Sequence, residues 1–348
     1  MYIYLVYFIG LLLLSFCLDR KNVPKKIIQA YFFFASIVLI FLIGSRAETV
    51  GIDTGQYAYI WNYDIKAGNF DYIDTEAELG FYYLQTFFKL FVSYQSFLFI
   101  IGGVSIVPIC YVVYRYSKKC ALAVLIFYSS IAFHTLEFAA ARQALAFTGV
   151  IIAFKFLMER KLAGFLATLF IAAFFHQTAV IFIPCYWLYN IKINKITSRI
   201  WLGIMFVSFA LSSTIFAFLN SFSRIDYSDS DIEAGGQRLF IVMLVFVIIG
   251  FVKRDLINKT PAIRIPFVLY SIAPLLWPIL NINPALYRLM YYFDFFLCLY
   301  VPNLLFVLPK GSKVKIMLYS LSLLVSLYIV LYMRTSEAYY PYKFFWEK

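Results

Sequence analysis

Long apolar runs separated by short basic connectors are the feature that most limits what this chain can fold into. A helix needs about 20 apolar residues to cross a bilayer core of about 30 Å. Runs of this kind, two of them shorter, recur along the 348 residues. They occupy residues 2–18, 27–44, 94–114, 120–134, 139–158, 162–175, 177–189, 200–219, 238–252, 265–281, 286–308 and 315–333. The pattern predicts an all-α polytopic membrane protein with about 12 transmembrane or re-entrant helices.

The composition agrees with a membrane protein. Hydrophobic residues make up 63% of the chain and charged residues 14%, whereas soluble proteins hold about 25% charged residues. No polar linker sets off a soluble part, so we expect a single integral membrane domain over residues 1–348. The first run has no basic segment before it and no small-residue cleavage site after it. We therefore interpret it as a membrane helix and not as a signal peptide.

Basic residues lie mostly in alternate connectors, and this distribution predicts the topology. The connectors concerned are residues 20–26, 115–119, 155–161, 192–199, 253–264 and 310–315. Because cytoplasmic loops are enriched in Lys and Arg, we expect these connectors inside and both chain ends outside. The basic residues behind the net charge of +12 then serve to orient the helices, and they do not indicate nucleic-acid binding. The short runs 162–175 and 177–189 must return to one face, by crossing twice or as a re-entrant hairpin.

Two long loops fall on the outer side in this topology, residues 45–93 and 220–237. Within the first, residues 80–91 have the pattern of an amphipathic helix lying at the membrane interface.

The cysteines lie in or at the ends of apolar runs. They are Cys17, Cys110, Cys120, Cys185 and Cys298. There is no Cys-x-x-Cys pair and no His/Cys cluster, so we expect packing roles and neither disulfides nor a zinc site. The two histidines are far apart in sequence, and we predict no metal and no cofactor.

The segment from Arg46 to Tyr57 breaks out of the apolar run 27–44 with charged, glycine and hydroxyl residues. Charge at the membrane boundary usually has a partner or a ligand. The predicted topology places the other polar residues in or beside apolar runs in the same outer half. They are Asp53, Glu78, His134, Glu137, Arg142, Gln143, His176, Gln177, Arg288 and Asp294. We therefore expect a functional site in the outer half of the membrane.

Two arginines have surroundings that suit a phosphorylated ligand. Arg142 lies among alanines, which let a ligand approach closely, and a guanidinium binds phosphate through two parallel hydrogen bonds. In a helix, Arg288 shares a face with Tyr291 and Tyr292, and rings beside an arginine suit a sugar next to a phosphate. Either arginine could instead be a snorkelling residue at the membrane interface.

Three residues are candidates for proton transfer. His176 lies between the two short runs, where it could be a general base near neutral pH or a hydrogen-bonding helix end. Asp53 and Glu78 lie in or just before outer elements. Either carboxylate could act in catalysis or pair with an arginine.

Several motifs, in order along residues 30–300, resemble the EpsG-like family of bacterial polysaccharide polymerases, which is related to the Wzy O-antigen polymerases. They are Arg46-x4-Gly51-Ile-Asp53-x3-Tyr57, Glu78-Leu-Gly80-Phe, Arg142-Gln143-Ala-Leu-Ala, Met158-Glu-Arg-Lys, Phe175-His176-Gln-Thr-Ala-Val-Ile and Arg288-Leu-x-Tyr-Tyr. The loop 220–237 matches no pattern of the family.

The resemblance implies a metal-independent glycosyltransferase with a multi-helix, GT-C-like fold in the bacterial cytoplasmic (inner) membrane. It would transfer a growing glycan from undecaprenyl diphosphate to the next lipid-linked repeat unit, on the periplasmic side, and we favour O-antigen as the product. Its partners would be undecaprenyl-diphosphate-linked oligosaccharides and membrane lipids, with a chain-length regulator and a flippase as accompanying proteins.

Residue chemistry agrees with this assignment, because a diphosphate leaving group needs positive charge. We assign Arg46, Arg142 and Arg288 to diphosphates and His176 to the base, with Asp53 or Glu78 as alternatives. Gln143, Tyr57, Tyr291 and Tyr292 complete the expected binding residues.

A secondary transporter, or a flippase of a glycan or lipid-linked anion, is the main alternative, since charges within the membrane are common in transporters. The crowding of polar residues in one membrane half argues against a midplane transport site. A membrane acyltransferase would want a catalytic His-Asp or a paired His, which neither histidine provides. A purely structural subunit would not explain why polar residues are placed within the membrane, where burying them is costly.

Overall fold

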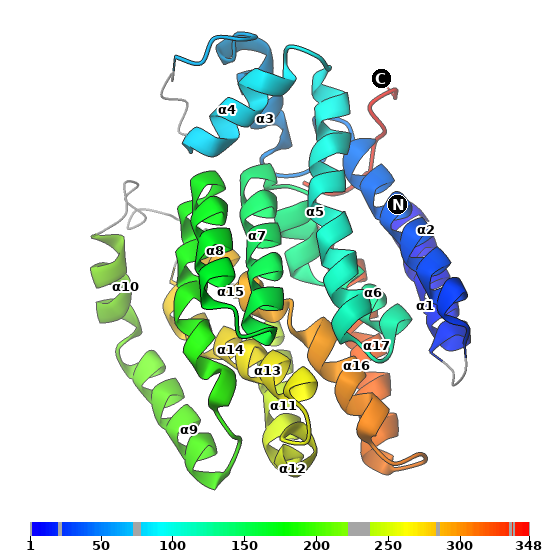
Figure 1. Ribbon diagram of the computed structural model, residues 1–348, viewed down its shortest axis with the longest axis vertical. Helices are drawn as coiled ribbons and strands as arrows, with labels where there is room; N and C mark the ends of the chain where they lie inside the picture. Colours follow the sequence, from blue (N-terminus) through cyan, green and yellow to red (C-terminus); the bar gives the residue numbers. More distant parts are fainter. Residues whose placement is uncertain are drawn as a thin grey trace. The chain divides into compact units, whose positions relative to one another are not determined.

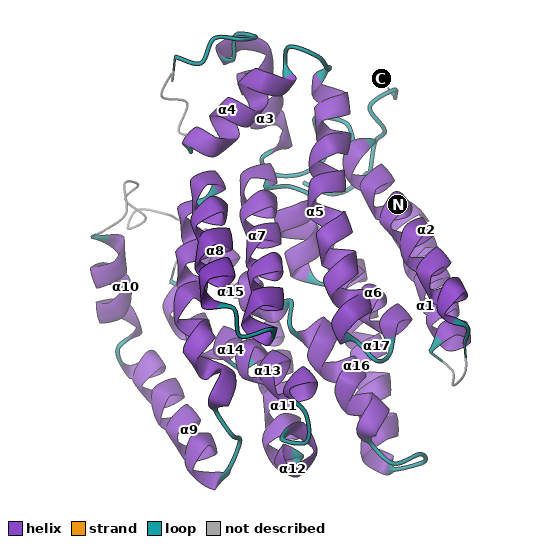
Figure 2. Ribbon diagram, in the orientation of Figure 1, coloured by secondary structure: helices purple, strands orange, loops and turns teal. Residues whose placement is uncertain are grey.

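Regular structure in the described part of the chain is helical, apart from one isolated β-bridge (Figure 1, Figure 2). The computed structural model describes residues 2–19, 23–71, 78–221, 237–282, 286–333, 336 and 338–347. The chain divides into two compact units. The first comprises Met1–Tyr186 and Ser320–Lys348, and the second comprises Trp187–Tyr319.

Long helices form the frame of the first unit. They are α1 (Tyr2–Leu18), α2 (Lys25–Gly44), α5 (Tyr94–Tyr116), α6 (Cys120–Tyr128), α7 (Ala141–Met158) and α8 (Leu162–Phe175). Helix α7 packs against α5 and α8, α5 packs against α2, and α1 packs against α6. The predicted run 120–134 is interrupted, because α6 ends at Tyr128 and a π-helical turn, η2 (Phe133–Glu137), follows.

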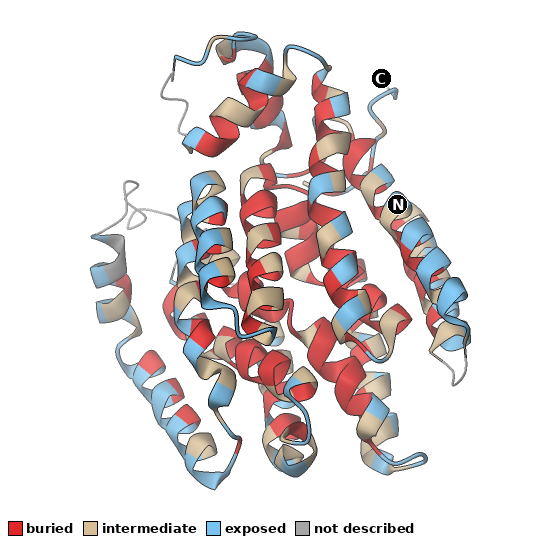
Figure 3. Cartoon of the chain, in the orientation of Figure 1, coloured by how far each residue is buried: buried red, intermediate tan, exposed pale blue. Residues whose placement is uncertain are grey.

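Helix surfaces show how this unit meets its surroundings. Figure 3 shows a mostly buried α7, whereas α2 and α5 alternate between buried and exposed residues. Along the middle of these two helices the exposed residues are apolar, among them Phe33, Phe34 and Val107. A water-soluble protein rarely exposes apolar patches of this size. These faces therefore match the hydrocarbon part of a bilayer.

Basic connectors of the first unit meet one another. The carboxylate of Asp19, after α1, accepts hydrogen bonds from the backbone of Ala121 and Leu122 at 3.1 and 2.8 Å, and the Nζ of Lys119 donates to the Asp19 carbonyl. Tyr116, at the end of α5, packs against Phe154 near the end of α7. The connectors predicted to share the cytoplasmic face thus lie at a common end of the helices.

The segment 45–93, predicted to lie outside, forms short helices in its described part, at the opposite end of the first unit (Figure 1). It contains α3 (Thr54–Tyr59), continued by a π-helical turn, η1 (Ile60–Asp64), and α4 (Leu79–Phe88). The helix predicted at 80–91 therefore ends earlier. It ends where the Nζ of Lys89 donates hydrogen bonds to the carbonyls of Trp61 and Ile65 at the end of η1. A cation at the carboxyl end of a helix satisfies its last carbonyls.

The two short runs after α7 form a hairpin. Helix α8 is followed by a 3-10 helix, η3 (Gln177–Asn190). Phe165, near the start of α8, packs against Phe182 and Tyr186, and Arg160 donates to the carbonyl of Tyr186 at 3.1 Å. The chain therefore returns to the end from which α8 started, as the charge pattern required.

The second unit is helical as well. Its elements are α9 (Lys195–Ala210), α10 (Ser212–Asn220), α11 (Gln237–Val252), α12 (Arg254–Ile257), α13 (Pro261–Tyr270), α14 (Ile272–Leu280), α15 (Tyr287–Asp294), α16 (Leu297–Val307) and the start of α17 (Lys313–Met333). Asn194 and Thr197 form a capping box at the start of α9, which satisfies free backbone groups there. Helix α13 packs against α16, and α14 packs against α9 and α15. Most of the loop 220–237 lies outside the described residues.

The helices confirm a polytopic membrane protein. Each of the twelve predicted runs contains helix, but four of them, 120–134, 200–219, 265–281 and 286–308, are each broken into two elements. In the ranges that the structure describes, six helices are long and apolar enough to cross a membrane, or seven if the pair Lys195–Ala210 and Ser212–Phe218, bent by 74°, counts as one span. The remaining runs are shorter helices, so their crossing stays a prediction.

Candidate active site

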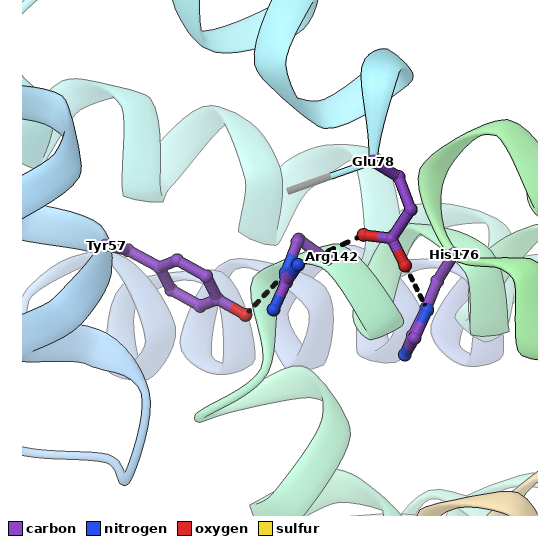
Figure 4. A network of polar contacts seen from close by, with 4 residues as sticks. All are labelled: Tyr57, Glu78, Arg142 and His176. Atoms are coloured by element: carbon purple, nitrogen blue, oxygen red, sulfur yellow. Dashed lines mark hydrogen bonds and ion pairs between the residues drawn. The ribbon is translucent and has the colours of Figure 1, made fainter. Parts of the chain in front are cut away.

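A chain of polar contacts joins residues from four segments of the first unit (Figure 4). Arg142 on α7 lies at its centre. Its Nε donates to the hydroxyl of Tyr57 at 3.3 Å, and its Nη1 lies 3.1 Å from Oε2 of Glu78. The other carboxylate oxygen, Oε1, contacts Nδ1 of His176. The order of contacts is therefore Tyr57, Arg142, Glu78 and His176.

Each member stands at or near the end of a helix. Arg142 occupies the first turn of α7, Glu78 precedes α4, and His176 follows α8 in an extended backbone conformation. Tyr57 lies on α3, where its ring packs in an apolar cluster. The backbone N–H and C=O groups at a helix end have no partner within the helix, and the chain changes direction there. Side chains that are far apart in sequence can therefore meet where several helix ends lie together.

Gly80 explains how Glu78 can reach His176. A Cβ atom at Gly80 would lie 2.5 Å from the carbonyl oxygen of Phe174, at the end of α8. Only glycine lets the start of α4 approach the end of α8 this closely. The approach places the residue before α4 beside the residue after α8.

The network is partly screened from water. The side chains of Arg142 and Glu78 are 24% and 23% exposed. Partial burial alone would raise the pKa of Glu78, but the hydrogen bond and charge of His176, together with the charge of Arg142, lower that pKa below its ordinary value. Glu78 is therefore a carboxylate near neutral pH. It holds the imidazole on one side and the guanidinium on the other.

Because Nδ1 of His176 faces the Glu78 carboxylate, Nε2 is the ring nitrogen left to accept a proton whenever the imidazole is neutral. The expectation that Glu78 pairs with an arginine matches the structure. Asp53, half-buried just before α3, interacts electrostatically with Arg142. Of the three acid–base candidates, Glu78 and His176 are in direct contact.

Arg46 has different surroundings from Arg142. Its side chain is 1% exposed. Its Nη1 donates to the carbonyl of Ile43 at 2.6 Å, its Nε donates to Oγ1 of Thr54 at 3.3 Å, and its guanidinium lies over the ring of Phe138. A side chain so enclosed does not reach a ligand. We therefore revise its role from direct diphosphate contact to positioning of the segment that leads into α3.

The carboxyl-terminal segment closes over Arg46, which sequence reasoning missed. Arg46 and Phe344 form the β-bridge, and the backbone N–H groups of Ala47 and Phe345 donate to Lys343 and Ser45 at 2.9 and 3.0 Å. Further on, Gly51, with a φ of +103°, donates to the carbonyl of Ala338 at 2.7 Å. In the sequence, the aromatic residues between Tyr339 and Trp346 could have indicated this contact, because aromatic side chains usually pack against another part of a protein.

The other predicted binding residues are distributed as follows. Gln143 is buried on α7, and its Oε1 has no hydrogen-bond partner within the described ranges. Arg288, half-buried, and Tyr291 and Tyr292 share α15 of the second unit. Tyr292 is fully buried, so its ring packs in the protein. Within the described ranges, no three His, Cys, Asp or Glu side chains are grouped as metal ligands.

The fold and the network define a multi-pass helical membrane protein with acid–base and cationic groups at one end of its helices. The chain belongs to the EpsG family, whose family model matches residues 29–344. This is a Wzy-like, polymerase-type family, which supports a polysaccharide polymerase. No curated protein and no solved structure matches the chain.

Proposed function

We propose that this protein is a glycosyltransferase that polymerises lipid-linked repeat units at the outer face of the bacterial cytoplasmic membrane. The growing glycan would leave undecaprenyl diphosphate and pass to a hydroxyl group of the next repeat unit. We favour O-antigen as the product. Family membership supports the reaction class, and the contact chain Tyr57–Arg142–Glu78–His176 is the observation that carries the chemistry.

The acid–base part of the reaction follows from the Glu78–His176 contact. The acceptor hydroxyl oxygen bonds to the anomeric carbon of the donor sugar while Nε2 of His176 takes the hydroxyl proton. The bond from that carbon to the diphosphate oxygen breaks, and the diphosphate leaves with the electron pair. Glu78 fixes the imidazole tautomer and stabilises the imidazolium, as a carboxylate does in other positioned His bases.

The cationic part rests on Arg142. Its guanidinium is held in place by Tyr57 and Glu78 while staying partly exposed. A positive charge fixed in advance stabilises a leaving diphosphate without reorganising during the reaction. On the second unit, Arg288 stays a candidate contact for a lipid-linked diphosphate, with Tyr291 beside it on α15. Gln143 could bind a sugar hydroxyl through Oε1.

The topology proposal extends to all twelve runs, in the manner of multi-helix GT-C-like glycosyltransferases. Helix α8 has 14 residues and is about 21 Å long. The 3-10 helix η3 also has 14 residues and rises about 28 Å. Basic connectors at a common end of the first unit support their placement in the cytoplasm. The site then faces the periplasm.

The proposed function is tested by deleting the gene in a strain that makes a long surface polysaccharide. Single repeat units should remain on the lipid core, and the wild-type gene should restore long chains. Purified protein should elongate undecaprenyl-diphosphate repeat units in the presence of a chelator. Normal long chains in the deletion strain would contradict the polymerase. Repeat units trapped on the cytoplasmic face would indicate a flippase, and a strict metal requirement would contradict the metal-independent mechanism.

A further inference from the structure

Two tyrosines stand out on the outer surface of the first unit. Tyr59 is 60% exposed and Tyr63 is 72% exposed. They are four residues apart on the continuous helix formed by α3 and η1, and their ring centroids are 4.9 Å apart at an interplanar angle of 39°. Neighbouring rings at this spacing form one continuous aromatic surface.

Polar side chains share this helix face. Gln56 and Asn62 are also exposed, and each lies three residues from Tyr59. Residues at such spacings are neighbours on a helix surface. Lys66, also exposed, follows the end of η1 in the chain. Amide groups at the edge of aromatic rings bind hydroxyl groups, while the rings cover apolar C–H surfaces. A pyranose ring presents both kinds of surface.

The opposite face holds the helix in place. Tyr57 and Trp61 are buried in an apolar cluster that includes residues of α4, α5 and α7. The hydroxyl of Tyr94 donates to the carbonyl of Thr54 at 3.0 Å, and Lys89 binds the carbonyls at the other end. The tyrosine face is therefore presented by a rigid element. Rigid presentation lowers the entropy cost of binding.

A lipid-facing surface on the same outer segment has different chemistry. At the end of α4 the exposed residues are Phe87, Leu90 and Phe91, which offer only carbon to their surroundings. Such side chains suit acyl chains. The α3–η1 face instead has a hydrogen-bonding group on every exposed side chain named above. This contrast favours a hydroxyl-rich ligand over lipid.

The helix that carries this face also carries one residue of the candidate active site. Tyr57, whose hydroxyl accepts from Arg142, lies on the opposite, buried side of α3. We propose that the face formed by Gln56, Tyr59, Asn62 and Tyr63, with Lys66 following it in the chain, binds the growing glycan, with sugar rings stacked on the two tyrosines. This inference rests on the proposed polymerase function. A polymer held here stays bound to the protein between additions, which favours long chains.

The test compares the double variant Tyr59→Ala/Tyr63→Ala with wild type in two measurements. Binding is measured by saturation-transfer NMR on protein in nanodiscs, with oligosaccharide fragments of two or more repeat units from the strain's own polymer. Affinity should fall about tenfold or more, since removing a central tyrosine from a binding surface usually has an effect of this size. Polymer length should shorten several-fold, while addition of a first repeat unit continues.

Matched controls come from the same chain. Tyr328 and Tyr332 on α17 are also four residues apart, 40% and 53% exposed, with rings 6.2 Å apart. Their double alanine variant should bind and polymerise as wild type does. Tyr59→Trp/Tyr63→Trp should restore binding and chain length, because it restores aromatic surface. If the double alanine variant lowers Tm, Tyr63→Ala alone, at the more exposed position, provides the comparison.

Unchanged affinity and chain length in the α3–η1 double variant would overturn this inference while leaving the polymerase in place. Equal losses in the α17 control would overturn it as well, since the effect would then not belong to this face. If wild-type protein elongates nothing, the proposed function itself has failed. The two failures are therefore distinguished by the wild-type reaction.

Discussion

Arg46 and Arg142 look alike in the sequence and differ in the structure. Both follow apolar or small residues at a membrane boundary, and both were assigned to diphosphates. Arg46 is enclosed by backbone carbonyls, an aromatic ring and the carboxyl-terminal segment. Arg142 stays 24% exposed and contacts two side chains of the candidate active site. A buried arginine whose hydrogen bonds go to the protein builds the fold, and a partly exposed one beside an acid–base pair is suited to chemistry.

The first prediction concerns Arg142→Ala, for which we expect the largest effect on activity. Elongation of lipid-linked repeat units should fall about 100- to 1000-fold, as when a preorganised group is removed from a transition state. The protein should still purify as a folded species. Arg142→Lys should also be impaired, because an ammonium cannot hold Tyr57 and Glu78 in the same forked geometry. Wild-type elongation by the alanine variant would remove Arg142 from the site.

The second prediction concerns Arg46→Ala, which should act on stability first. The change removes a buried side chain and leaves the Ile43 carbonyl without its donor, which costs about 3 kcal/mol or more. Thermal unfolding in detergent and protein abundance in the membrane measure this loss. If the variant has normal Tm and abundance but no activity, Arg46 contacts the ligand after all. The proposed difference between Arg46 and Arg142 would then be wrong.

The third prediction concerns Gly80→Ala, which tests the close approach of α4 and α8. The added Cβ would lie 2.5 Å from the Phe174 carbonyl oxygen, so α4 must shift and carry Glu78 away from His176. We expect about a tenfold loss of elongation, comparable to misplacing a catalytic group. Gly103→Ala on α5 is the control, because its Cβ would meet no atom within 4 Å. Equal activity of both variants would contradict the positioning role.

The fourth prediction, with the smallest effect, follows from the lowered pKa of Glu78. A carboxylate whose pKa is lower in the folded state stabilises the fold fully above its unfolded pKa, about 4.3, and loses that contribution as pH falls through the folded pKa. The excess stability of wild type over Glu78→Gln should therefore be present above about pH 5 and decline as the pH falls further. It should be about 1 kcal/mol or less, because the pair is partly exposed.

This fourth prediction is measured by thermal unfolding of both proteins across pH. A wild-type advantage that grows as the pH falls below about 5 would mean that the pKa of Glu78 is raised in the folded protein, against the described contacts with Arg142 and His176.

The helices were largely predictable because hydropathy is a local property. Each predicted apolar run contains helix, although four of them are broken into two elements, and the basic connectors of the first unit meet as the charge pattern required. The helices differ from the predicted runs where contacts with a distant segment affect the backbone. Helix α4 ends at Phe88 because Lys89 turns to the carbonyls of η1, and no local pattern in residues 80–91 contains that information.

The site was predictable in its members more than in its contacts. Tyr57, Glu78, Arg142 and His176 were all named from the sequence, Tyr57 and Glu78 in the loop 45–93 and Arg142 and His176 in or between apolar runs. Their order of contact depends on the small volume of Gly80 against Phe174, a packing fact between segments far apart in the chain. The same holds for Tyr59 and Tyr63, whose spacing is visible in the sequence but whose exposure depends on which face of the helix is covered.

The sequence by itself indicated a multi-pass membrane protein, the basic connectors of the first unit that share one end, and the polar residues that lie at helix ends. It could do so because lengths, hydropathy and charge act over a few neighbouring residues. The tertiary structure decided that Arg46 is sealed by residues 338–347 and that Glu78 joins Arg142 to His176. These outcomes depend on close packing between distant segments, where a single Cβ atom or one carbonyl group determines which side chains can meet.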